Sequence, residues 1–237
     1  MNAIDHELPY RPAPVLTVLT VAGLGIFVAL DLMLVPSGLV GMYSVGVFNG
    51  EPRDQEMVDL AFLIRGLSAI GQMGMFLFTP AVFCMLMYRC AMNARALGFQ
   101  GFQHSAGWVV GWFFIPFAHL WMPYKAVGEV WQTSLVDPEE VPSTDWLFNN
   151  VGTLFSAWWA TWIFGTIFSN VSSKMSRSAT IDVETVGLCL TPFSAVLQAV
   201  SGLLCLIMVL KLTKRQYQQA LIVFANPSPT QGEMNNA

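Results

Sequence analysis

A proline-broken apolar segment in the middle of the chain places the strongest constraint on how this sequence can fold. Residues 105–131 read SAGWVVGWFFIPFAHLWMPYKAVGEVW, and before Lys125 the only side chain that titrates near neutral pH is His119. Pro116 and Pro123 each remove a backbone donor and clash with the preceding turn, so we expect no straight helix here. Irregular backbone at membrane depth is tolerated only against protein or a wet cavity. The segment therefore predicts a broken element that is shielded by a bundle of membrane helices.

The composition supports this interpretation. Of the 237 residues, 54% are hydrophobic and 11% are charged, whereas soluble domains contain about 25% charged residues. The net charge of -4 argues against a nucleic-acid partner. The four cysteines form neither a C-x-x-C pair nor a cluster with histidine, so we expect buried small hydrophobes and neither a metal nor a cofactor.

The apolar runs predict an all-α fold, a polytopic membrane helical bundle. A run of about 20 apolar residues is long enough to cross the hydrocarbon layer. The predicted membrane domain covers 15–216, after a short N-terminal segment at 1–14 and before a flexible tail at 217–237. The predicted spans are residues 15–34, 60–89, 105–124 (broken), 146–169 and 186–212.

Two topologies are open. If the broken segment crosses the membrane, there are five spans and the basic residues outside them divide evenly between the two sides. If it is a re-entrant hairpin that turns near Pro116, there are four spans and both termini share a side. Seven basic residues then lie on that side and three on the other: Arg11, Arg89, Arg95, Lys125, Lys211, Lys214 and Arg215 against Arg53, Lys174 and Arg177. The positive-inside rule favours the hairpin, with both termini cytoplasmic. It requires Gln100 and Leu135 to lie on the same face.

An ordered series of motifs runs through the second half of this region. It comprises R-x3-N-A from Arg89, G-W-x2-G-W-F-x-I-P at 107–116, L-W-x-P-Y at 120–124, E-V-W at 129–131 and W-W-x2-W from Trp158. The series resembles a bacterial multi-pass membrane family known only as a domain of unknown function, over roughly 62–216. Its members typically carry an amide residue where this chain has His119. The resemblance implies a helical fold in the bacterial inner membrane and supplies no activity, substrate or catalytic residue.

Asp31 and Arg65 are candidates for an intramembrane charge pair. A charge at the centre of a membrane helix costs about 2.5–3.5 kcal/mol on insertion scales, so each residue needs water or a partner. They stand at similar distances from the loop that joins the first two spans, so their depths in antiparallel helices match. The pair would line an ion or proton path, or it would be a structural ion pair.

Two further groups are candidate binding residues. His119, Trp158 and Trp162 form a candidate polar or ligand site: the histidine is either a relay or bonded to a carbonyl freed by proline, and the tryptophans either pack or line a pocket. Arg89, Asn93 and Arg95 form a basic motif at the cytoplasmic margin, which either binds anionic headgroups or sets topology. Lys125 and Glu129 have the spacing of a local helical ion pair.

No constellation of catalytic groups is evident, so we expect no catalytic residue and no enzyme activity. The sequence favours a membrane-embedded accessory or interaction protein that contacts the lipid bilayer and either a second copy or another membrane protein. The alternative is a small oligomeric channel or transporter that uses Asp31, Arg65 and His119, since discontinuous backbone at mid-membrane often marks a site.

Overall fold

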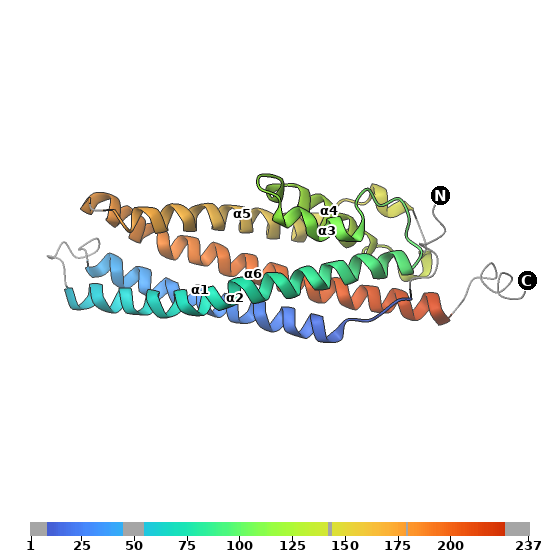
Figure 1. The fold of residues 1–237 in the computed structure, drawn as a ribbon, viewed down its shortest axis with the longest axis horizontal. Coiled ribbons are helices and arrows are strands. Elements are labelled where there is room, and N and C mark those ends of the chain that lie inside the picture. Colours follow the sequence, from blue (N-terminus) through green and yellow to red (C-terminus); the bar gives the residue numbers. More distant parts are fainter. Residues whose placement is uncertain (1–8, 45–54, 142–143, 179, 226–237) are drawn as a thin grey trace, which may run out of the picture. The chain divides into compact units, whose positions relative to one another are not determined.

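The computed structural model of the protein describes residues 9–44, 55–141, 144–178 and 180–225, which form helices joined by turns and loops and contain no strand (Figure 1). This confirms the all-α prediction. The α-helices are α1 (Pro14–Ser44), α2 (Gln55–Ala96), α3 (Ala106–Gly111), α4 (Met122–Thr133), α5 (Gly152–Met175) and α6 (Ile181–Ala225). Short 3₁₀ helices cover Trp112–Phe114, Ala118–Leu120, Pro138–Glu140 and Asp145–Phe148.

Three of these helices are long and apolar enough to cross a membrane. They are Pro14–Tyr43 in α1, Gln55–Ala96 in α2 and Asp182–Ala225 in α6. At about 1.5 Å per residue, the 42 residues of α2 make about 60 Å of helix, which is twice the thickness of a hydrocarbon layer. Helix α5 has 24 residues, but its tryptophans, serines, threonines and glycines lower its hydropathy, and it is not among the three.

The helices extend beyond the predicted spans. Helix α1 continues through Pro36 to Ser44, although we expected a loop from Pro36, and α6 continues to Ala225, although we expected a flexible tail from 217. Tertiary contacts account for both extensions: Ser37 donates from Oγ to the carbonyl of Ala61, and Gln219 donates from Nε2 to the carbonyls of Thr133 and Val136. The remainder of the predicted N-terminal segment (1–8), Arg53 and the tail at 226–237 lie outside the described residues.

The predicted span at 146–169 begins later than expected. Trp146 lies in the 3₁₀ helix Asp145–Phe148, is 1% exposed, and donates from Nε1 to the carbonyl of Gln100. Its ring stacks on Phe102 with the centroids 4.9 Å apart. Helix α5 starts only at Gly152, whose φ of 76° turns the chain in a conformation that glycine adopts without strain.

The chain divides into two compact units, and α1, α2 and α6 contribute to both of them. The first unit contains residues 1–20, 81–152 and 208–237, and the second contains 21–80 and 153–207.

The second unit is an antiparallel bundle of α1, α2, α5 and α6. Along α1 and α2, residues 23, 30 and 37 lie against 79, 71 and 61 respectively, so the two helices run in opposite directions. Helix α5 pairs with α6 in the same manner, because residues 158, 165 and 172 lie against 201, 198 and 187. Helix α6 also packs on α1, with Pro192 against Gly38.

The first unit contains a helical hairpin built from α3, the two 3₁₀ turns and α4. Helices α3 and α4 pack against each other, so the segment folds back on itself (Figure 1). Phe99 and Val136, which flank the hairpin, belong to one buried cluster together with Trp146 and residues of α2 and α6. Gln100 and Leu135 therefore lie at the same end of the hairpin.

Candidate functional site

A buried acid lies on the contact between α1 and α2. Asp31 is 4% exposed, and its Oδ1 accepts a hydrogen bond from Nε2 of Gln72 at 2.9 Å. Its other oxygen, Oδ2, is buried and has no hydrogen-bond partner among the described residues. Ser68 stands one turn from Gln72 on α2, is 1% exposed, and its Oγ is also without a partner in the described part of the chain. The site thus combines one satisfied and two unsatisfied oxygen atoms.

Arg65 has a different partner, on α6. Its Nη2 donates to Oγ1 of Thr191 at 2.7 Å. That hydroxyl also contacts Oγ of Ser172 on α5 at 2.9 Å and donates to the carbonyl of Gly187 at 3.1 Å. The guanidinium therefore ends a small polar network that joins three helices of the second unit.

The structure does not bring Asp31 and Arg65 together as an ion pair. Each residue hydrogen-bonds a neutral side chain instead, Gln72 for the acid and Thr191 for the base. On α2, the expected partner of Asp31 (Arg65) and the observed one (Gln72) are seven residues apart. Seven residues span about 10 Å along a helix. We predicted that Asp31 and Arg65 lie at the same depth. The sequence does not fix the register of two packed helices, so this displacement along α2 could not be predicted.

A hydrogen-bonded histidine and glutamate close the open end of the hairpin. Nδ1 of His104 lies 2.8 Å from Oε1 of Glu129, and the backbone N–H of His104 donates to Oε2 of the same carboxylate at 3.3 Å. Both side chains are about nine-tenths buried. Glu129 therefore contacts His104 instead of forming the local pair that we expected with Lys125, which is exposed.

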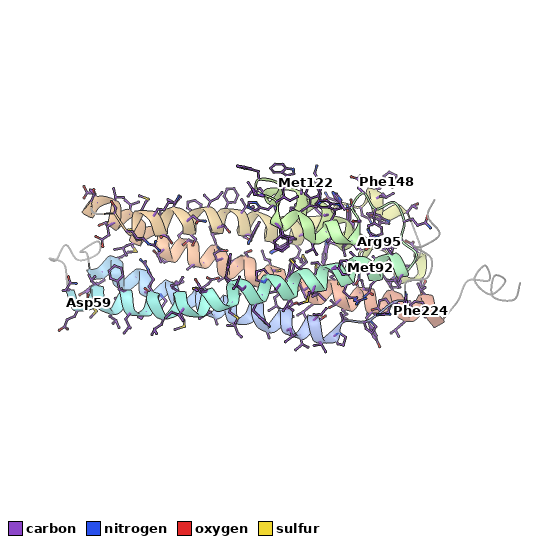
Figure 2. The ribbon with its side chains drawn as sticks, in the orientation of Figure 1. Asp59, Met92, Arg95, Met122, Phe148 and Phe224 are labelled. Atoms are coloured by element: carbon purple, nitrogen blue, oxygen red, sulfur yellow. The ribbon has the colours of Figure 1, made fainter. Side chains whose placement is uncertain are left out.

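Arg95 connects the open end of the hairpin to α2. Its Nη1 donates to the carbonyl of Ala91 at 2.7 Å, and its Nη2 donates to the carbonyl of His104 at 2.6 Å. The guanidinium also lies 4.2 Å from the centroid of the Phe102 ring, a cation–π geometry. Figure 2 labels Arg95 near the end of α2. The forked guanidinium can hold two carbonyls in fixed positions, which a lysine cannot do.

The far end of the hairpin is a strained turn that carries an aromatic side chain. Phe117 has φ 64° and ψ -48°, and Ala118 donates from its N–H to the carbonyl of Pro116 at 2.8 Å. This is the positive-φ form of the γ-turn, which is rare and strained. It is the one non-glycine residue with positive φ in the described ranges. The Phe117 ring is 76% exposed. We define the hairpin tip as the exposed aromatic residues Phe114, Phe117 and Trp121.

The structure places His119 and the two tryptophans in different units. His119 lies in the 3₁₀ helix Ala118–Leu120 of the first unit and is half-buried. Trp158 and Trp162 lie on α5 in the second unit. They form a row with Trp159, whose ring centroid is 5.5 Å from that of Trp158 and 4.9 Å from that of Trp162. The tryptophans thus contact one another along the helix.

The residues of the basic motif have separate partners. Asn93 is 4% exposed and forms two hydrogen bonds of 3.1 Å with the backbone of Arg11, which fix the N-terminal segment on α2. Arg95 holds the hairpin, and Arg89 is half-buried. Two residues of the motif therefore attach neighbouring segments to α2 within the first unit: Asn93 binds the N-terminal segment and Arg95 binds the hairpin.

His104 and its contact with Glu129 were not among the residues predicted from the sequence. A signal was present, because His104 stands twelve residues before Pro116 and Glu129 stands twelve residues after Phe117. A hairpin that turns between Pro116 and Phe117 brings these two positions together. The histidine was missed because it precedes the apolar segment and no local spacing connects it to the carboxylate.

Comparisons with known proteins identify a family for this chain. No curated protein and no solved structure matches the chain significantly. The profile of a family described as a domain of unknown function, DUF4328, matches residues 50–214. This range contains α2 to α5, most of α6, the hairpin and the His104–Glu129 contact. Because the match covers more than half of the sequence, this helical, apolar chain belongs to the DUF4328 family.

Proposed function

We propose that the protein is a non-enzymatic, membrane-embedded interaction protein whose hairpin tip contacts a helix of another membrane protein or of a second copy. We place it in the inner membrane of a bacterium, with four spans, one re-entrant hairpin and both termini in the cytoplasm. The observation that carries the proposal is Phe117, which keeps an exposed ring on a strained turn.

The topology rests on three features. Helix α5 lies antiparallel to the apolar part of α6 from Trp158 to Ser172, so it would cross the same layer and supply a fourth span. The hairpin returns to its starting end, so it adds no crossing. Both termini and seven of the ten basic residues other than Arg65 would then share the cytoplasmic side, as the positive-inside rule favours.

The role of the tip follows from the cost of its backbone. A bulky residue at positive φ costs on the order of 1–3 kcal/mol and persists where the surrounding structure holds it. Glycine would make the same turn without strain. Lipid contact requires only apolar surface, which Phe114 and Trp121 already supply. A specific protein contact gives a reason to keep one aromatic ring at this position.

Photo-crosslinking tests this proposal. A benzophenone amino acid replaces Phe117 in living cells, and adducts are identified by mass spectrometry. The matched control is Phe148, which is also aromatic, is 88% exposed and lies outside the hairpin (Figure 2). We expect a discrete adduct with one membrane protein, or with a second copy, at position 117 and not at 148. Lipid adducts alone at 117, or the same adducts at both positions, would contradict the proposal.

Cysteine labelling from each side of the membrane tests the topology. Single cysteines at Gln100 and Leu135 should react with the same impermeant reagent from the cytoplasmic side. Labelling from opposite sides would show that the broken segment crosses the membrane.

A small oligomeric channel or transporter is the second candidate function. It is favoured by Asp31 and Arg65, which place ionisable groups in the helices of an apolar bundle, where such residues are costly and often functional. His119, the third residue of this prediction, lies in the first unit, whereas Asp31 and Arg65 lie in the second. Liposomes with purified protein should show ion or proton flux that the Asp31→Asn variant lowers. Equal flux from both proteins would exclude a path through Asp31.

A further inference from the structure

The Asp31 carboxyl has no charged partner among the residues that the structure describes, although it lies inside the helical bundle. Gln72 satisfies only Oδ1, and Arg65 is bonded to Thr191. On α6, which packs on α1, the sequence has no Asp, Glu, Lys, Arg or His between Glu184 and Lys211. On α5 the first such residue is Lys174, and on α2 there is none between Arg65 and Arg89. An isolated carboxylate in such a medium is strongly unfavourable, so its charge has to be neutralised.

A second buried oxygen lies on the same contact surface. The α2 residues Ala61, Gln72 and Thr79 face α1, and Ser68 falls on the same face because helical positions repeat every three to four residues. A serine in a helix often bonds the carbonyl four residues earlier. The Ser68 hydroxyl does not do so here, and it remains buried without a partner among the described residues.

We propose that Asp31, Ser68 and Gln72 form a binding site for a small monovalent cation, a proton or Na⁺, between α1 and α2. Oδ2 of Asp31 and Oγ of Ser68 supply the two open oxygen atoms, and Gln72 holds the carboxyl group through Oδ1. Hard oxygen ligands suit an alkali cation, and a proton bound to Oδ2 of Asp31 would neutralise the carboxylate. The site is independent of the hairpin tip, and it requires a resident cation but no transport.

Covalent labelling tests occupancy of the site. Purified protein in detergent is treated with the hydrophobic reagent dicyclohexylcarbodiimide, which reacts with protonated carboxyl groups, and adducts are located by mass spectrometry. We expect an adduct on Asp31 that increases as pH falls. If Na⁺ occupies the site, NaCl protects Asp31 and choline chloride does not; if only a proton does, NaCl has no effect. The proposal would be overturned if Asp31 stays unlabelled at every pH. It would also be overturned if the extent of labelling depends on neither pH nor Na⁺ concentration.

Ser68→Ala keeps the test decisive if an Asp31 variant fails to fold. The substitution removes one of the two oxygen atoms that lack a partner. We expect about tenfold weaker cation binding, measured as a shift in the pH or Na⁺ concentration that gives half-maximal labelling. The loss of one hydrogen bond to a charged group implies a change of this size. Ser37→Ala is the matched control, because its hydroxyl lies on the same helix pair but is bonded to the carbonyl of Ala61. Equal midpoints in wild type and Ser68→Ala would overturn the role of Ser68 and with it the proposed site.

Discussion

Nδ1 of His104 and Oε1 of Glu129 lie within hydrogen-bond distance, 2.8 Å apart, although the two residues are 25 positions apart in the sequence. The pair joins the two arms of a hairpin whose centre is the γ-turn at Phe117. Because Arg95 also donates to the carbonyl of His104, the open end of the hairpin is attached to α2. Three polar side chains, those of Arg95, His104 and Glu129, thus hold the open end of this segment.

Removal of the Glu129 carboxylate should loosen the hairpin. Glu129→Ala leaves the Nδ1 and the backbone N–H of His104 without an acceptor in a buried place, which costs about 1–3 kcal/mol. Equilibrium unfolding in mixed micelles measures this loss. Lys125→Ala, one turn earlier on α4 and exposed, should change the free energy of unfolding by less than about 0.5 kcal/mol. Equal losses for the two variants would show that Glu129 acts through a local pair with Lys125.

Glycine at position 117 should give a more stable protein than alanine does. Glycine adopts φ near 64° without strain, whereas alanine keeps the clash of its Cβ, so we expect a difference of about 1 kcal/mol in favour of Phe117→Gly. The comparison at Phe114 provides the control, since its φ is not positive and glycine there should be the less stable variant. The same Phe117→Gly protein should lose the partner adduct that we propose for the hairpin tip. A preference for alanine at both positions would contradict the strained turn.

Thr191→Val should destabilise the contact of α2 with α6. The change keeps the shape of the side chain but removes the hydroxyl that accepts from Arg65 and contacts Ser172. Arg65 is half-buried, and the loss of a hydrogen bond to a charged group costs about 1.5–3 kcal/mol. Thr161→Val is the control, because the Thr161 hydroxyl bonds only carbonyls of its own helix. Thermal unfolding in detergent should therefore separate the two variants, and similar midpoints would argue against the Arg65–Thr191 bond.

Gly187→Ala should disrupt the packing of α5 against α6. A Cβ at position 187 would collide with the backbone nitrogen of Ser176, which cannot rotate away, so we expect a loss of 1 kcal/mol or more, on the order of other overpacked sites. Gly74→Ala is the matched control on α2, where a Cβ meets nothing within 4 Å and alanine should stabilise the helix by about 1 kcal/mol. Opposite signs of the two changes in unfolding free energy are the expected result. A neutral Gly187→Ala would contradict the close approach of the two helices.

Much of the fold could be predicted from local patterns. The apolar runs at 15–34, 60–89 and 186–212 fall inside α1, α2 and α6, because a long apolar stretch has to satisfy its backbone groups within a helix. The break near Pro116 was also predicted, since proline interrupts the helical hydrogen bonds. The start of α5 was wrong by several residues, because Trp146 packs under Phe102 in the first unit instead of continuing the apolar helix.

The candidate sites were predicted less well. Asp31 and Arg65 are conspicuous because a charge in an apolar helix is costly, and the structure places Asp31 in a buried contact. Their partners Gln72 and Thr191 were not identified, because an amide or a hydroxyl in a helix has no pattern that distinguishes it from its neighbours. The same reason applies to Ser68.

The sequence by itself determined that this protein is helical, that its apolar helices are long enough to cross a membrane, and that its middle segment is broken. These properties follow from residue hydropathy and from the geometry of proline, which act over one or two turns of chain. Only the tertiary structure decided that His104 meets Glu129, that Gln72 and not Arg65 bonds Asp31, and that α6 remains helical to Ala225. These outcomes depend on the register and rotation of packed helices, which are set by contacts between residues far apart in the chain.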